Sequence, residues 1–347
     1  MQGETAAVAW DRPKTPRNCA TRCGWLWLVL LGATAVQAQT CQSATDMDPA
    51  VRTALETTAK GYFDVAARGD SATLQKNSIA AVAANFSGIE TAVKDNQAAF
   101  TGAHAAVRPP FVLTIEGSQP QEPAEFLCGV FGKSGQTADS TVFILHNLPP
   151  GKYGIAILDA QGTQDARTLT MILQQAGTDW KLAGFYARPV QVNGHDGAWF
   201  AQRARDFKAK GQNRNAWLYY REASALSAPV DFMSTLATDK LYDEMQAVVP
   251  SDLPMNGKTV EVSAGTKTYH LTEIFPLAVG NDLDVVAKYQ TADVSNTAQT
   301  YQENMVVTKA LLAKFPEFRE AFAGVVVRAV EPSGRDYGSL MAMQDVK

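Results

Sequence analysis

The chain has 347 residues, of which 46% are hydrophobic and 19% are charged, so it can bury a sizeable core and is not expected to be disordered. Its 31 basic and 35 acidic residues give a formal net charge of −4, which provides no basic field for nucleic acid or anionic lipid. We therefore expect a folded protein of two or three units that does not bind nucleic acid.

The N-terminal residues 1–38 have the pattern of an export signal. Four basic side chains between residues 12 and 22 precede an apolar run at residues 24–36, and Ala38 ends a small-residue cleavage site. The run is shorter than the about 20 residues of a membrane-spanning helix. We therefore expect cleavage after Ala38 and a periplasmic or secreted protein. The alternative is an uncleaved signal that anchors the chain to a membrane.

Cleavage would remove Cys19 and Cys23 and would leave Cys41 and Cys128 as the cysteines of the mature chain. Two remaining cysteines in an oxidising compartment often pair, which makes a disulfide between them one expectation. The other is that they stay apart, since Cys41 lies in a segment expected to be loose and Cys128 in an apolar strand.

Helical signals dominate from residue 48 to residue 100. Asp48 and Pro49 suit an N-cap and a first-turn proline, and apolar residues recur at helical spacing as far as Gly69. A second helix is expected from Asp70 or Ser71 to Phe86, and a third from about residue 89 to residue 100.

The apolar period changes from helical to two at residue 111, which predicts strands. Short polar or glycine-containing turns separate successive strands, and connections without helices favour an antiparallel meander. We expect helices packed on one face of a curved sheet. The predicted strands cover residues 111–116, 125–131, 141–146, 153–158, 167–174 and 180–187.

Residues 48–188 contain the early segment GYFDVAARGDSATLQ and the late strand segment DWKLAGFY, and in this order of helices and strands they resemble the nuclear transport factor two-like superfamily. The resemblance implies a cone-shaped fold whose mouth holds a ligand or catalytic acids. His146 is the candidate for such a role, with a histidine satisfied at a strand end as the plainer interpretation. The segment LPPGKY is similar to a turn of carboxypeptidase regulatory-like sandwiches, but the preceding helices count against a pure sandwich.

Residues 197–229 resemble a single tetratricopeptide unit, a pair of antiparallel helices. Small and large residues alternate there at the spacing of that family: Phe200, Ala204, Phe207, Gly211, Ala216, Tyr220 and Ala223. One unit cannot bury its own apolar face, so we expect it to pack on a neighbouring domain as a connector. Its exposed face carries three candidate partner-binding residues, Arg203, Arg214 and Arg221.

The remaining pattern predicts a small α+β unit from residue 257 to residue 347. A hairpin at residues 259–275 and a strand at residues 283–289 precede a helix at about residues 296–315 and one or two final strands. The whole chain is thus predicted to be α+β. Its parts are a signal peptide (1–38), an α+β domain with an antiparallel sheet (39–188), a helical connector (189–250) and a small α+β domain (257–347).

No motif of hydrolases, zinc proteases or nucleotide-binding proteins occurs, and the scattered histidines offer no metal spacing. His195 and Asp196 are neighbours, but an N-cap role suits Asp196 better than a metal. We therefore expect no cofactor, no metal and no catalytic residue. The first hypothesis is an exported, non-enzymatic binding or scaffold protein with a protein, peptide or envelope partner. The alternative is a small-molecule binder or enzyme that uses a cavity in the N-terminal domain.

Overall fold

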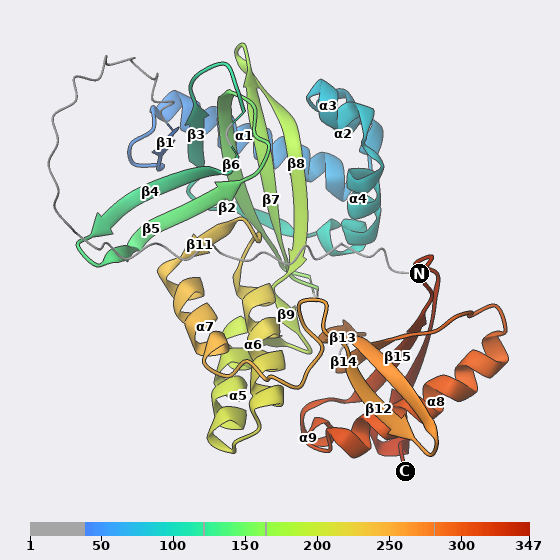
Figure 1. Cartoon of the computed structure of the whole chain (residues 1–347). Coiled ribbons are helices and arrows are strands. Elements are labelled where there is room, and N and C mark those ends of the chain that lie inside the picture. Colours follow the sequence, from blue (N-terminus) through green and yellow to red (C-terminus); the bar gives the residue numbers. More distant parts are fainter. Residues whose placement is uncertain (1–38, 121, 164, 281) are drawn as a thin grey trace, which may run out of the picture.

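A computed structural model describes residues 39–347 except 121, 164 and 281 (Figure 1). The predicted signal peptide therefore lies outside the described residues, as do Cys19 and Cys23. The described part is an α+β protein with antiparallel sheets, as predicted.

The first helices follow the predicted segment with one correction. Asp48 caps the first helix through the amide of Ala50 at 2.7 Å. The single helix predicted between residues 70 and 86 is wrong, because it is divided into two where the amide of Ile79 donates to the Leu182 carbonyl at 2.9 Å. This bridge to a distant strand replaces helical hydrogen bonds. The helices are α1 (Pro49–Ala67), α2 (Ser71–Lys76), α3 (Ala80–Ala84) and α4 (Ser87–Phe100).

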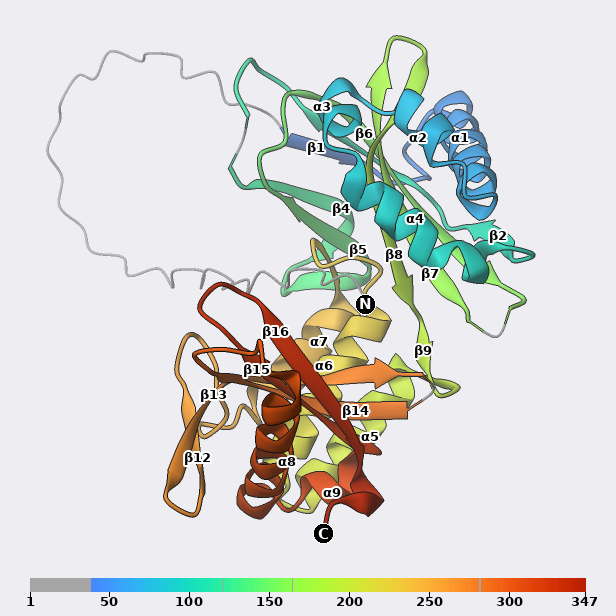
Figure 2. The same cartoon turned by 90° about the vertical axis from the view of Figure 1, so that its right-hand side faces the viewer.

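The main sheet has the order β1-β3-β6-β7-β8, with β2 paired to β6, and all its ladders are antiparallel. Its strands are β1 (Gln39–Gln42), β2 (His104–Val107), β3 (Phe111–Ile115), β6 (Gly151–Gln161), β7 (Arg167–Ala176) and β8 (Asp179–Pro189). The helices cover one face of this sheet (Figure 2). Leu55, Phe63 and Phe100 of the helices belong to one buried cluster with Leu169 and Met171 of β7. This layering is the one predicted from helices followed by strands.

A second, three-stranded sheet covers part of the other face of the main sheet. It contains β4 (Ala124–Gly132), β5 (Gly135–Leu145) and β11 (Met233–Thr235), in the order β11-β5-β4. Phe126 and Phe143 turn inward against Ile155 and Ile172 of the main sheet. The predicted continuous meander is therefore wrong for β4 and β5, which leave the main sheet because their apolar side chains need a face to bury against.

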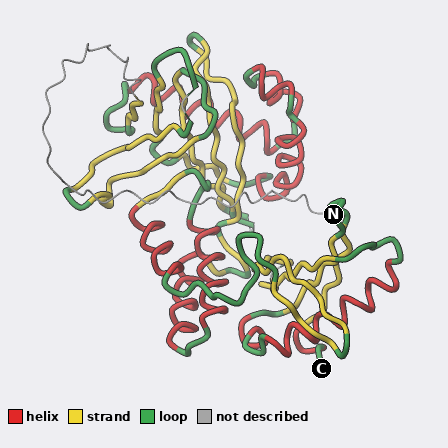
Figure 3. The backbone as a smooth tube through the Cα atoms, viewed as in Figure 1, coloured by secondary structure: helices red, strands yellow, loops and turns green. Residues whose placement is uncertain are grey.

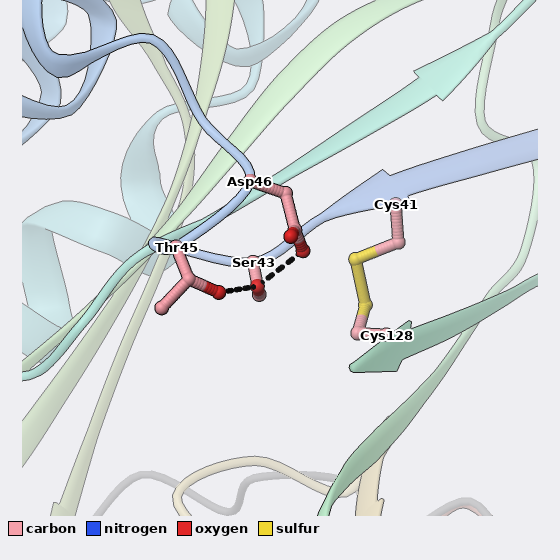
Figure 4. Close-up of a disulfide and its surroundings, with 5 residues drawn as sticks. All are labelled: Cys41, Ser43, Thr45, Asp46 and Cys128. Carbon is pink, nitrogen blue, oxygen red and sulfur yellow. Dashed lines mark hydrogen bonds between the residues drawn. A yellow bond between two sulfur atoms is a disulfide. The ribbon is translucent and has the colours of Figure 1, made fainter. Parts of the chain in front are cut away.

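Cys41 of β1 and Cys128 of β4 form a disulfide that links the two sheets, with a Cα–Cα distance of 5.2 Å (Figure 4). The segment around Cys41 is not loose, because it forms β1 and pairs with β3. The polar residues that follow, Ser43, Thr45 and Asp46, hydrogen-bond with one another and start the turn into α1 (Figure 4).

A short hairpin, β9 (Gln191–Val192) and β10 (His195–Asp196), leads into two antiparallel helices and a third. These are α5 (Gly197–Ala209), α6 (Asn213–Ser227) and α7 (Leu236–Gln246). Ala204 and Ala216 are fully buried, as expected for helices in close approach. Gly197 also permits the close approach of α5 and α6, because a Cβ atom there would lie 2.2 Å from the Ser227 hydroxyl and 2.8 Å from the Ala223 carbonyl oxygen.

The C-terminal part is a five-stranded sheet covered by a helix (Figure 3). Its elements are β12 (Val260–Ala264), β13 (Lys267–Val279), β14 (Asp282–Gln290), α8 (Thr297–Lys314), α9 (Phe318–Ala321), β15 (Gly324–Val330), β16 (Asp336–Ala342) and a final 3-10 turn, η1 (Met343–Asp345). α8 connects β14 to its parallel neighbour β15. One continuous core joins this sheet to the helical pair, because Phe200, Phe207 and Tyr219 belong to the same buried cluster as Phe318 and Phe322.

Candidate functional site

A row of polar residues crosses the main sheet at the end nearest the helical pair. Asp159 of β6 pairs with Thr168 of β7, which pairs with Arg188 of β8. Arg108 joins the row from the end of β2, where its amide donates to the Ile157 carbonyl at 2.8 Å. The antiparallel register thus brings together four residues that are up to 80 positions apart in the sequence.

The row lies on the same face of the sheet as the apolar cluster beneath the second sheet. Along β6, Ile155 and Ile157 belong to that cluster, and the next residue of the same parity is Asp159. Along β7, Ile172 is apolar, whereas Thr170 and Thr168 are polar. The Thr170 hydroxyl is buried and has no hydrogen-bond partner among the described residues. One half of this face is therefore packed, and the other half is polar.

The polar half opens into a cavity of about 340 Å³ between the sheet and the helical pair, called here the junction cavity. Its opposite wall is formed by the first turn of α5 and the last residues of α6. The residues that line it are Arg108, Thr168, Arg188, Pro189, Val190, Asp196, Gly197, Ala198, Leu226, Ser227, Ala228 and Pro229.

The carboxylates near the junction cavity already have partners. Arg108 donates to Asp159 through Nε at 2.9 Å and through one terminal nitrogen at 2.6 Å, and the Thr168 hydroxyl adds a bond of 3.2 Å. The hydrogen bond from Arg108 holds the pKa of Asp159 below its usual range. Arg188 pairs with Asp231, and Asp196 accepts from the Trp199 amide at 2.9 Å.

The guanidinium groups, in contrast, keep donors to spare. A guanidinium carries five N–H donors. The described structure uses nitrogens Nε and Nη2 of Arg108, and Nη2 of Arg188. Both side chains are partly exposed, at 41% and 25%, and both residues line the cavity. The N-terminus of α5 adds the positive end of a helix dipole at the opposite wall, where the Asp196 carboxylate caps the first turn.

The three arginines predicted to bind a partner lie elsewhere. Arg203 is the exposed one, with its guanidinium 5.6 Å from the Trp199 ring centre and 3.5 Å from the Asp206 carboxylate. Arg214 pairs with Asp252 and Glu317 and thereby joins α6 to the C-terminal part.

Arg221 lies over the Trp217 ring at 5.0 Å and donates to the Ile274 carbonyl at 3.3 Å. Burial lowers the pKa of this guanidinium. Arg214 and Arg221 thus serve contacts within the chain, and the structure does not bring the three arginines together into one site.

The histidines also lie outside the junction cavity. His146 is a partly exposed residue after β5 that pairs with Glu122. His195 stacks on Trp199, with ring centres 3.8 Å apart. Asp196 caps α5, as predicted from the sequence.

Another ionisable residue is perturbed by burial. Glu222 of α6 is 8% exposed, and burial raises its pKa to about 7. It does not line the junction cavity. It lies on the face of α6 shared with Asn215 and Tyr219, which donate to the Glu317 and Ala321 carbonyls at the two ends of α9.

The sequence alone did not identify Arg108, Asp159, Thr168 or Arg188 as candidate site residues. A usable signal existed, because Asp159, Thr168 and Thr170 share a strand face with apolar residues such as Ile155, Ile157 and Ile172. Period-two alternation therefore marks them, but only when the strand face is known. The link to Arg108 and Arg188 depends on the sheet register, which the sequence pattern does not specify.

Within residues 39–347, apart from the three positions not described, no cluster of His, Cys, Asp or Glu is suited to hold a metal ion. In the same part of the chain, no helix combines the length and hydropathy needed to cross a membrane. Comparison of the chain with protein-family models, with curated proteins and with solved structures finds no match.

Proposed function

We propose that this chain is a binding protein that holds a small organic anion in the junction cavity. The observation that carries the proposal is the surplus of hydrogen-bond donors. Arg108 and Arg188 present unused N–H groups, while Asp159, Asp196 and Asp231 are engaged in hydrogen bonds or ion pairs. A carboxylate or phosphate matches the fork of a guanidinium group.

Two further features support an anion. The first turn of α5 lines the cavity, and the N-terminus of a helix favours negative charge. Next to Thr168, two residues along the same face of β7, the buried Thr170 hydroxyl lacks a hydrogen-bond partner among the described residues.

Binding suits the cavity better than proton transfer does. A general acid or base works best with a pKa near the operating pH. The ion pair with Arg108 lowers the pKa of Asp159, which keeps this carboxylate charged and weakly basic. We also infer that the protein acts outside the cytoplasm, since a predicted export signal and the Cys41–Cys128 disulfide both suit an oxidising compartment.

The test is calorimetric titration of the mature chain with acetate, succinate, citrate and inorganic phosphate at low ionic strength. Arg188→Gln should weaken binding by about 10- to 100-fold, because a charge-assisted hydrogen bond contributes about 1.5–3 kcal/mol. Arg203→Gln is the matched control, since Arg203 lies on the exposed side of α5 away from the cavity. Equal losses in both variants, or no binding by any of the four anions, would refute the proposal.

A second candidate function is contact with an extended segment of a partner protein at β4. In the described structure β4 ends its sheet, so its outer edge pairs with no strand. Leu127 and Val130 are 57% and 65% exposed there. The bulge between Gly129 and Phe131 breaks the alternation and turns Val130 outward. The Glu125 amide already donates to the Gln39 side chain at 2.7 Å, and the Val130 carbonyl accepts from the Thr137 hydroxyl at 2.6 Å. A strand added to this edge would pair the backbone groups that remain and would pack beside Leu127 and Val130.

Crosslinking of the mature chain in its native envelope fraction tests this second function. Val130→Lys should abolish a crosslinked species, because edge lysines oppose strand addition. Leu340→Lys is the control, since Leu340 is 54% exposed on a different sheet. A crosslink that survives in Val130→Lys and is lost in Leu340→Lys would place the contact elsewhere.

A further inference from the structure

A second cavity, of about 420 Å³, lies in the C-terminal part. It is bounded by the start of β13, by the end of β14 with the loop that follows, and by the first two turns of α8. Its size falls within the range of small-molecule sites, which are about 300–1,000 Å³. Its lining includes Lys267, Tyr269, Tyr289, Asp293, Gln299 and Glu303. We call it the tyrosine cavity.

Tyr289 gives this cavity an unsatisfied hydrogen-bonding group. The residue is 1% exposed, and its hydroxyl has no hydrogen-bond partner among the described residues. Most buried hydroxyl groups in proteins have a partner, so an exception requires an explanation. The Tyr269 ring packs edge-on against the Tyr289 ring, with centres 5.5 Å apart, and fixes its orientation.

The hydroxyl of Tyr289 remains a neutral donor over the physiological range. Burial raises the pKa of Tyr289, and the nearby Glu303 carboxylate raises it further. The same carboxylate raises the pKa of Lys267 through an ion pair. The cavity therefore offers a phenol that donates a proton beside a carboxylate that accepts one.

The charges around the cavity are matched in pairs. Lys267 Nζ lies 2.8 Å from a Glu303 oxygen and 4.9 Å from the Tyr269 ring centre. Asp293 pairs with Arg335 at 2.9 Å and accepts from the Ser295 amide at 2.9 Å. A charged ligand would have to disturb these pairs, whereas a neutral polar ligand would not. The arginines of the junction cavity are also paired, and each keeps N–H donors beyond its ion pair, as Lys267 and Arg335 do to a lesser degree. The neutral phenol of Tyr289 is the group that sets the tyrosine cavity apart.

We infer that the tyrosine cavity binds a neutral polyhydroxylated ligand, of the class of a single sugar unit. A hydroxyl group can accept from the Tyr289 hydroxyl and donate to the Glu303 oxygen that Lys267 leaves unused. The Gln299 amide at the opposite wall provides both a donor and an acceptor for a neighbouring hydroxyl. A ligand with a single carbonyl group could accept from the Tyr289 hydroxyl but could not donate to the Glu303 oxygen. A ligand with adjacent hydroxyl groups can do both.

A free monosaccharide and the terminal unit of a glycan present the same hydroxyl groups. The probes are therefore glucose, galactose, mannose and N-acetylglucosamine, each as the free sugar and as an oligosaccharide of that unit. Binding to the mature chain is measured by saturation-transfer NMR and calorimetry. A preference for the free sugar or for the oligosaccharide identifies the source, and either one supports the inference.

Tyr289→Phe removes only the hydroxyl and should weaken sugar binding at least tenfold. Tyr153→Phe is the matched control, because Tyr153 is equally buried but donates to the Pro149 carbonyl at 2.8 Å in the N-terminal part. Without sugar, Tyr153→Phe should lower the melting temperature and Tyr289→Phe should not, since only Tyr153 loses a hydrogen bond.

Unchanged affinity in Tyr289→Phe, or no binding by any probe, would overturn the inference. A lowered melting temperature of sugar-free Tyr289→Phe would count against it too, because it would mean that the hydroxyl already has a structural partner. Arg188→Gln should bind sugar like the unmodified chain. Loss of anion binding at the junction cavity can thereby be distinguished from loss of sugar binding at the tyrosine cavity.

Discussion

Replacing Glu222 with glutamine should change how the stability of this protein depends on pH. Burial raises the pKa of Glu222 from 4.5 to about 7, although Arg221 acts in the opposite direction. The folded protein therefore holds a proton on this carboxyl at pH values where the unfolded chain has released it. Stability from this group is complete below about pH 4.5 and is lost as the pH rises to about 7.

The size of the effect follows from the same values. One pKa unit corresponds to about 1.4 kcal/mol, so the charged form of Glu222 costs the folded state about 3 kcal/mol at pH 8. Glu222→Gln cannot become charged. The variant should therefore gain about 3 kcal/mol relative to the unmodified chain between pH 4.5 and pH 8.

Urea denaturation followed by tryptophan fluorescence at several pH values measures this difference. Glu244→Gln provides a control of opposite sign, because hydrogen bonds from Arg205 and Tyr220 lower the pKa of Glu244. That variant should be less stable than the unmodified chain at pH 7, by no more than about 1 kcal/mol at this partly exposed site, and the deficit should shrink as the pH falls. A difference between Glu222→Gln and the unmodified chain that stays constant from pH 5 to pH 8 would refute the reasoning.

Three further predictions concern the framework. Reduction of the Cys41–Cys128 disulfide, which closes a loop of 87 residues, should lower the free energy of unfolding by up to about 4 kcal/mol, as measured by urea denaturation with and without dithiothreitol; identical midpoints would contradict a structural role. Gly197→Ala should destabilise the chain by about 1–3 kcal/mol, because the added methyl group meets the backbone of Ala223. Gly61→Ala, where nothing lies within 4 Å of the added methyl group, should instead increase the free energy of unfolding by up to about 1 kcal/mol and so raise the melting temperature. A change in melting temperature of the same sign in both variants, measured by calorimetry, would exclude close packing as the cause of the Gly197→Ala effect.

Much of the local structure was predictable because its causes are local. The first helix begins where Asp48 and Pro49 supply a cap and a first turn, and the strands of the main sheet follow their period of two. The α+β class followed from these signals and is confirmed. The resemblances to tetratricopeptide units and to the nuclear transport factor two-like superfamily stay predictions.

What the sequence pattern missed depends on contacts between distant residues. The break at Ile79 comes from a carbonyl of Leu182, and β1 exists because its four residues pair with β3. Neither partner is visible to a local pattern. The same holds for function, since Arg214 and Arg221 resemble free surface arginines until their partners in the C-terminal part are known.

The place of β11 ties the predicted connector to the first part of the chain. These three residues follow the helical pair, yet they pair with β5 in the first part, and Asp231 beside them binds Arg188.

The chain therefore crosses between its two halves more than once. A fragment that ended near residue 190 would lack β11 and would leave the β5 edge unpaired. Such a fragment is expected to aggregate when expressed alone. Cleavage of the intact protein in the 189–196 link, in contrast, should leave two pieces that stay associated through β11 and the Arg188–Asp231 pair. The protein is thus a candidate for split-protein complementation, with the cut placed in that link.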